Sequence, residues 1–130
     1  MKRFKLFMGV LIGFLVLGTT AVKAEDTLQD LIDSASNGDT VKLTTNYTES
    51  ISIEEDKNLT LDLNGYTLTS CEVEVMGNLT VIDSQEGGTI ACSTNNWSTI
   101  VVEGGTFTLE SGTITNSTYY GIYAKDGGTA

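Results

Sequence analysis

Histidine and proline are absent from this sequence of 130 residues, which contains one arginine, Arg3, and two cysteines, Cys71 and Cys92. Without histidine or a Cys-x-x-Cys pair, the chain lacks the usual ligands of zinc and haem sites. The absence of proline removes one common means of protecting an exposed edge strand. The absence of histidine and of a Cys-x-x-Cys pair leads us to expect no cofactor.

The first 24 residues have the features of a secretory signal peptide. Three of the first five residues are basic, an apolar run spans 6–18, and Val22-Lys23-Ala24 places small residues at a cleavage position. The run is shorter than the roughly 20 apolar residues of a membrane span. We therefore expect cleavage after Ala24, a secreted or cell-surface location, and no membrane insertion of the mature chain.

Basic residues are scarce beyond this segment. Lys42, Lys57 and Lys125 stand against 17 acidic residues, which gives residues 25–130 a formal charge of −14. Because nucleic acid and anionic lipid are bound by Lys and Arg side chains that neutralise phosphates, no such partner is expected. Polyanionic substrates such as pectin are disfavoured for the same reason, unless metal ions bridge.

Short phrases with alternating apolar and polar residues recur in a fixed order. Three segments can be superimposed: ISIEEDKNLTLDLNGYTLTSC, VEVMGNLTVIDSQEGGTIAC and IVVEGGTFTLESGTITN. Their first strands, and that of the next copy, begin near Ile51, Val73, Ile100 and Ile122, at intervals of 22, 27 and 22 residues. A period of this length with three strands per repeat indicates a solenoid. An antiparallel β-sandwich also has short alternating strands, but it does not predict this ordered repeat.

The predicted fold is therefore all-β, a right-handed parallel β-helix with about three strands per coil over residues 39–130. Each coil would stack about 4.8 Å above the last, so that equivalent side chains form interior columns. The expected columns are Leu59/Leu79/Phe107, Leu61/Val81/Leu109 and Leu68/Ile90/Ile114. The alternating threonines would face water.

Residues 25–38 are predicted to form an N-terminal capping helix. Apolar residues recur there at helical spacing, namely Leu28, Leu31, Ile32 and Ala35. Asp26 or Thr27 is placed as the N-cap, and Asn37-Gly38 as the stop. Such a helix would cover the open end of the first coil.

The coils are expected to be incomplete at the C-terminal end. Asp126-Gly-Gly-Thr-Ala130 repeats Glu103-Gly-Gly-Thr-Phe107, which opens a strand in the earlier copy. We expect either that further coils follow Ala130, or that a complete chain self-associates through its final coil, Tyr119 to Lys125, because that coil would present unpaired backbone.

The segment LDLNGYTL, together with the Asn-Leu-Thr-Val and Gly-Gly-Thr-Ile phrases, resembles pectate-lyase-like β-helix domains of surface and adhesin-like proteins of Gram-positive bacteria. The resemblance covers residues 25–130. It implies the β-helix fold more than any chemistry, because the family includes lyases, hydrolases and non-enzymatic surface modules.

The sequence does not show the combinations of catalytic residues that enzymes of this family use. A pectate lyase has an Arg or Lys base beside calcium-binding acids, and polygalacturonase-like enzymes combine aspartates with histidine; the lysines here are expected in turns or at edges. Asp62, Asp83 and Glu110 are expected one coil apart on an outward face. Acidic side chains stacked in this way are typically solvated. The alternative is that they form a weak calcium site. No catalytic residue is assigned.

Aromatic residues offer a second candidate site. Trp97 lies in STNNWST, the insertion that lengthens one repeat, and Tyr119, Tyr120 and Tyr123 cluster near the end of the chain. Exposed aromatic rings stack on the apolar faces of sugars, and loops on rigid scaffolds often carry binding residues. Trp97, Tyr119 and Tyr120 are the ligand-binding candidates; the alternative is that Tyr119 or Tyr123 packs against a neighbouring corner.

The two cysteines are expected to remain separate. Aligning Leu68 with Ile90 places Ser70 level with Cys92 and leaves Cys71 one residue out of register, and adjacent residues of a strand point in opposite directions. No disulfide is predicted.

These patterns predict a secreted or cell-surface β-helix module with a structural, adhesin-like or glycan-binding role and no evident catalytic site. Its expected partner is an extracellular glycan or a host surface. The alternative is a fragment of a carbohydrate-active enzyme, either a polysaccharide lyase or a glycoside hydrolase, whose active site lies in coils absent from this sequence.

Overall fold

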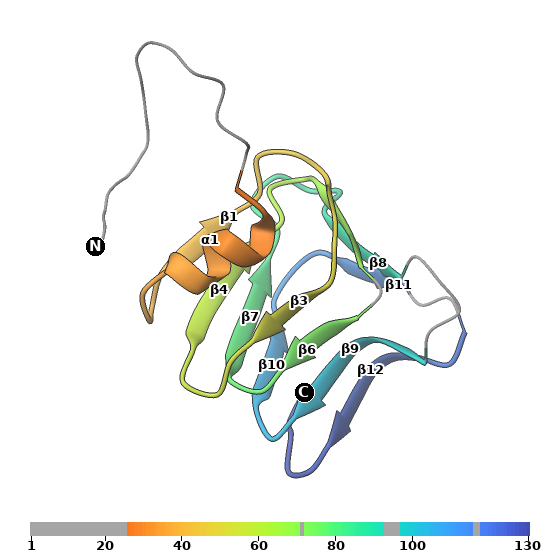
Figure 1. Ribbon diagram of the computed structural model, residues 1–130. Coiled ribbons are helices and arrows are strands. Elements are labelled where there is room, and N and C mark those ends of the chain that lie inside the picture. Colours follow the sequence, from red (N-terminus) through yellow and green to blue (C-terminus); the bar gives the residue numbers. More distant parts are fainter. Residues whose placement is uncertain (1–25, 71, 93–96, 116–117) are drawn as a thin grey trace, which may run out of the picture.

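Three parallel sheets surround one apolar interior in the computed structural model, which describes residues 26–70, 72–92, 97–115 and 118–130 (Figure 1). Residues 1–24, interpreted above as a signal peptide, lie outside the described residues. No helix in the described part of the chain is long and apolar enough to cross a membrane.

The described residues form one short helix and twelve strands. In chain order these are α1 (Leu28–Ser34), β1 (Thr40–Lys42), β2 (Tyr47–Thr48), β3 (Ile51–Ile53), β4 (Asn58–Asp62), β5 (Thr67–Ser70), β6 (Val73–Val75), β7 (Asn78–Ile82), β8 (Thr89–Cys92), β9 (Ser98–Glu103), β10 (Thr106–Leu109), β11 (Thr113–Thr115) and β12 (Tyr120–Lys125). The strands form three 4-stranded sheets, with the orders β1-β4-β7-β10, β11-β8-β5-β2 and β12-β9-β6-β3.

The chain winds through the three sheets in turn. Each strand from β1 to β9 pairs in parallel with the strand three places later in the chain. Each coil therefore consists of three successive strands, and four coils stack on one another. This confirms the predicted parallel β-helix and excludes the antiparallel sandwich. The repeat did not reveal β1 and β2, which are only three and two residues long.

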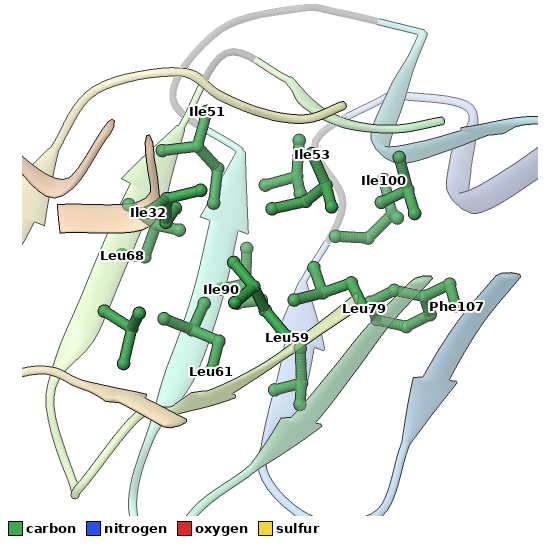
Figure 2. Packing of buried hydrophobic residues seen from close by; sticks show 14 of the residues in the cluster. Ile32, Ile51, Ile53, Leu59, Leu61, Leu68, Leu79, Ile90, Ile100 and Phe107 are labelled. Atoms are coloured by element: carbon green, nitrogen blue, oxygen red, sulfur yellow. The ribbon is translucent and has the colours of Figure 1, made fainter. Parts of the chain in front are cut away.

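The strand register confirms the three predicted columns. Cα partners join Leu59–Leu79–Phe107, Leu61–Val81–Leu109 and Leu68–Ile90–Ile114. The first coil extends two of these columns, because Val41 pairs with Leu61 and Tyr47 with Leu68. Figure 2 shows Leu59, Leu79 and Phe107 among the side chains packed in the interior.

Leu109 has the predicted register but not the predicted burial. Leu61 and Val81 are 1% and 0% exposed, whereas Leu109 on the outer strand β10 is 38% exposed. Beyond β10, the described residues add to this sheet only a bridge from Thr129 to Thr106. An interior side chain of a solenoid is buried when coils cover it on both sides. The repeat predicted the register of Leu109 but did not show that no further strand covers it among the described residues.

The predicted capping helix forms, although it is shorter than residues 25–38. Thr27 is the N-cap, and its capping box with Asp30 explains why the helix begins at Leu28. Leu28 and Ile32 are buried in the core cluster. The helix ends at Ser34, before the predicted Asn37-Gly38 stop.

Two side chains join α1 to the first coil. The Gln29 amide pairs with the backbone of β3: Nε2 donates to Ser52 O (3.0 Å), and Oε1 accepts from Ser52 N–H (2.8 Å). Glu49 accepts the N–H groups of Leu28 and Gln29 at 3.0 and 2.9 Å. Gln29 thus makes the hydrogen bonds that a preceding coil would make, and Glu49 places its charge at the positive end of the helix.

Replacing Gln29 with alanine is expected to lower the free energy of unfolding by about 1–3 kcal/mol, because it leaves two part-buried backbone groups of Ser52 without partners. Urea titration followed by circular dichroism measures this change. The control is Gln85→Ala, which truncates an exposed glutamine in a turn. Equal effects of the two substitutions would show that the amide of Gln29 does not close the β3 edge.

Ser70 is level with Cys92, as the alignment predicted. Cys92 is the last residue of β8 and is half-buried. Cys71 lies outside the described residues, so the expectation of two separate thiols stays a prediction.

Candidate functional site

Asp62, the first of the three acidic candidates, is buried at the end of β4. Its side chain is 3% exposed; Oδ1 accepts the N–H groups of Asn64 (2.9 Å) and Ser84 (3.0 Å), and Oδ2 lies 3.6 Å from Lys42 Nζ. Asn64 and Gly65 have φ values of 51° and 82°, a conformation that favours Asn and Gly. Asp62 therefore stabilises this turn and ties it to the next coil.

Burial acts to raise the pKa of Asp62, but other contacts outweigh it. Hydrogen bonds from Ser84 and Asn64 and the charge of Lys42 stabilise the carboxylate, so that the pKa of Asp62 lies below its ordinary value. A depressed pKa in the folded state means that ionised Asp62 stabilises the fold. That contribution is complete above the ordinary pKa of about 3.9 and is lost as the pH falls through the lower, folded value.

Replacing Asp62 with asparagine is expected to cost about 1–3 kcal/mol of stability at neutral pH, because hydrogen bonds to a charged acceptor are lost. The difference from the original chain should narrow below pH about 4. Urea titrations across this pH range measure it, with Asp56→Asn at an exposed turn position as the control. A difference that does not change with pH would contradict the assigned role of the carboxylate.

Asp83 does not stack on Asp62, contrary to the expected column. The register places Asp62 level with Ile82, one residue before Asp83. Asp83 Oδ1 accepts the N–H of Gly65 and Oδ2 accepts that of Gly88, both at 2.7 Å. Both carboxylate oxygens therefore bind backbone groups of neighbouring turns.

Glu110 is one strand away from Asp83, because β10 pairs with β7, and two strands away from Asp62. It follows β10, the second strand beyond β4 in the same sheet, and its side chain is exposed. Throughout residues 26–70, 72–92, 97–115 and 118–130, no three acidic, cysteine or histidine side chains form a group that could hold a metal ion. The geometry thus gives the calcium interpretation of Asp62, Asp83 and Glu110 no support.

The lysines that follow residue 25 all contact oxygen atoms. Lys42 and Lys125 lie on the outer strands β1 and β12; Lys42 Nζ is 3.6 Å from Asp62, and Lys125 Nζ is 3.3 Å from Glu103. Lys57, in the turn before β4, donates to two backbone carbonyls at the C-terminal end of α1. The lysines therefore lie at sheet edges and in a turn, where the sequence placed them.

The aromatic candidates come together, in contrast to the acids. The rings of Trp97 and Tyr119 lie 5.0 Å apart at an interplanar angle of 33°, and those of Tyr120 and Tyr123 lie 5.6 Å apart at 21°. Their exposed fractions are 69%, 61%, 47% and 45% in chain order. We call these four residues the aromatic patch. Its tyrosines are exposed rather than packed into a neighbouring corner.

Parallel pairing of β9 and β12 creates the aromatic patch. Trp97 directly precedes β9, Tyr119 directly precedes β12, and the N–H of Tyr120 donates to the carbonyl of Trp97 at 2.8 Å. Residues separated by one coil in the sequence thus become neighbours. The candidate set from the sequence missed Tyr123, although the ring stacks on Tyr120; the clustering of tyrosines near the end of the chain was the available indication.

The two candidate sites differ in what they can do chemically. The carboxylates of Asp62 and Asp83 accept backbone N–H groups and so hold turns of neighbouring coils together. The exposed rings of the aromatic patch present apolar faces, which favour stacking against sugars. Comparison with family models, with curated proteins and with solved structures gives no match, so the interpretation of this site rests on its own geometry.

Proposed function

We propose that the chain is a secreted or cell-surface β-helix module that binds a glycan through the aromatic patch and has no catalytic site. The observation that carries this proposal is the contact between Trp97 and Tyr119, two largely exposed rings held 5.0 Å apart. Burial of large apolar side chains normally stabilises a fold, and rings that stay exposed instead commonly serve binding.

Three further observations support the proposal. The basic and apolar N-terminal segment favours export, and the sequence resembles pectate-lyase-like surface domains of Gram-positive bacteria, which include adhesin-like modules. The pairing of β9 with β12 fixes the backbone that bears the rings before any ligand arrives, and such preorganisation lowers the entropic cost of binding. An extracellular glycan, including one on a host cell, is the partner that this chemistry fits.

Binding can be followed with the protein's own fluorescence, because Trp97 is the single tryptophan of the chain. We expect the purified chain to bind members of a glycan array that includes neutral and acidic sugars. The same glycans should shift or quench Trp97 emission on titration. No retained glycan, or release of shortened sugar products during the titration, would contradict a non-catalytic glycan-binding module.

Replacing Trp97 with alanine is expected to weaken glycan binding at least about tenfold, which corresponds to about 1.4 kcal/mol. Isothermal titration calorimetry measures this, since the substitution removes the fluorophore. Trp97→Phe should retain part of the affinity because a ring remains. The matched control is Leu109→Ala, which truncates an exposed apolar side chain outside the aromatic patch and should leave affinity unchanged. An equal loss of glycan affinity in both alanine variants would show that the aromatic patch is not the binding site.

A further inference from the structure

The aromatic patch consists of two ring pairs rather than one. Trp97 contacts Tyr119, and Tyr120 stacks on Tyr123. The pairs are neighbours along the chain, because Tyr119 and Tyr120 are consecutive, and the hydrogen bond from Tyr120 N–H to Trp97 O joins the backbones of the two pairs. Each pair leaves both of its rings between 45% and 69% exposed, so each offers its own stacking surface.

The charges around the aromatic patch disfavour an acidic ligand. Lys125 is on the same strand as Tyr120 and Tyr123, but its ammonium group lies 3.3 Å from Glu103. Lys42 is paired with Asp62, and Lys57 binds the end of α1. The described residues thus hold no lysine without an oxygen partner, and they contain no arginine.

Residues 25–130 carry a formal charge of −14, which repels a uronate, a sialic acid or a phosphorylated sugar. A neutral sugar escapes this repulsion because its recognition needs only apolar ring faces and hydroxyl groups. The negative charge of the chain therefore favours neutral over acidic glycans. The number of ring pairs indicates the length of the ligand.

We infer that the ligand is an uncharged oligosaccharide of at least two pyranose units, a conclusion that rests on the proposed glycan-binding function. One unit stacks on Trp97 and Tyr119, and the adjacent unit stacks on Tyr120 and Tyr123. The first pair carries the largest exposed ring, and the second pair extends the contact along the chain of sugars.

The test titrates the full chain with neutral glucose and N-acetylglucosamine oligomers of increasing length, and with galacturonate oligomers as acidic probes. Trp97 emission and calorimetry are the readouts. We expect affinity for a neutral ligand to rise at least about tenfold from the monosaccharide to the oligomer. Binding should be nearly independent of salt, because screening acts only on charges.

A substitution in the second ring pair separates the two subsites. Tyr123→Ala should remove the gain in affinity that a longer sugar brings, and Tyr123→Phe, which keeps a ring, should retain that gain. Circular dichroism verifies that both variants are folded. Leu109→Ala again serves as the control outside the aromatic patch.

The outcomes distinguish this inference from the proposed function. Binding confined to galacturonate or to another charged sugar, and weakened by salt, would overturn the inference and leave glycan binding intact. Equal affinity for monosaccharide and oligomer would overturn the two-unit ligand. Absence of binding to every glycan, or burial of Trp97 in an assembly of the chain with itself, would overturn both.

Discussion

Replacing Leu61 with aspartate is expected to abolish folding of the β-helix. Leu61 is 1% exposed and pairs in register with Val41 on one side and Val81 on the other. An aspartate at this position would bury a charge without a partner between two apolar coils. The loss should exceed about 4 kcal/mol, a large share of the roughly 5–15 kcal/mol that stabilises an ordinary domain. Circular dichroism and urea titration measure it.

Two control variants isolate the interior column from its surroundings. Thr60→Asp adds the same charge at the preceding residue, which is half-buried and faces the opposite side of the strand, so the effect should be mild. Leu109→Asp places the charge in the same column at a side chain that is 38% exposed, so its cost should lie between the other two. Equal destabilisation at all three positions would contradict the observed burial.

Replacing Gly105 with alanine is the second substitution with a large expected effect. A Cβ at Gly105 would overlap the carbonyl oxygen of Gly77 in the coil beneath. That oxygen also accepts the N–H of Thr106 at 2.9 Å, so it cannot move without breaking a bond between coils. We expect a loss of about 3 kcal/mol or more, measured by urea titration.

Gly121→Ala is the matched control for Gly105→Ala. A Cβ at Gly121 would meet nothing closer than a methyl carbon of Ile114 at 3.8 Å, which is an ordinary contact. The change in unfolding free energy should therefore stay close to the difference in strand propensity between glycine and alanine. Similar losses for the two substitutions would show that close stacking at the Gly77–Gly105 corner is not what requires glycine.

The corner below Gly77 explains why one coil has lysine where later coils have glycine. Asn78 N–H donates to Lys57 O at 2.9 Å, just as Thr106 N–H donates to Gly77 O in the next coil, so Lys57, Gly77 and Gly105 occupy equivalent places. Beneath Lys57 lies the link from α1 to β1, where Asn37 Oδ1 accepts the N–H of Asn58 at 2.9 Å. The Lys57 side chain reaches the carbonyls of Asp33 and Ala35 at the end of α1. The cap helix thus provides the space that permits a side chain there.

Periodicity was enough to predict the fold. The apolar alternation around Leu59, Leu79 and Phe107, and the repeated glycines between strands, predicted parallel coils and the register that the structure has. The cap helix was also predictable, because the spacing of Leu28 and Ile32 and the Thr27 cap are local features of the chain. Such local patterns involve residues that are close in the sequence, and each coil repeats them, so that they can be recognised without a structure.

Only the tertiary structure decided which side chains meet across coils. In the structure, Asp62 accepts the N–H of Ser84 and Asp83 accepts that of Gly65, whereas the sequence indicated a column of acidic side chains. The tertiary structure also brought Trp97 against Tyr119 and left Leu109 half-exposed. The physical reason is that these contacts join residues about one coil apart, so a shift of a single residue in register, or the presence of a covering coil, changes the partner without changing the repeat.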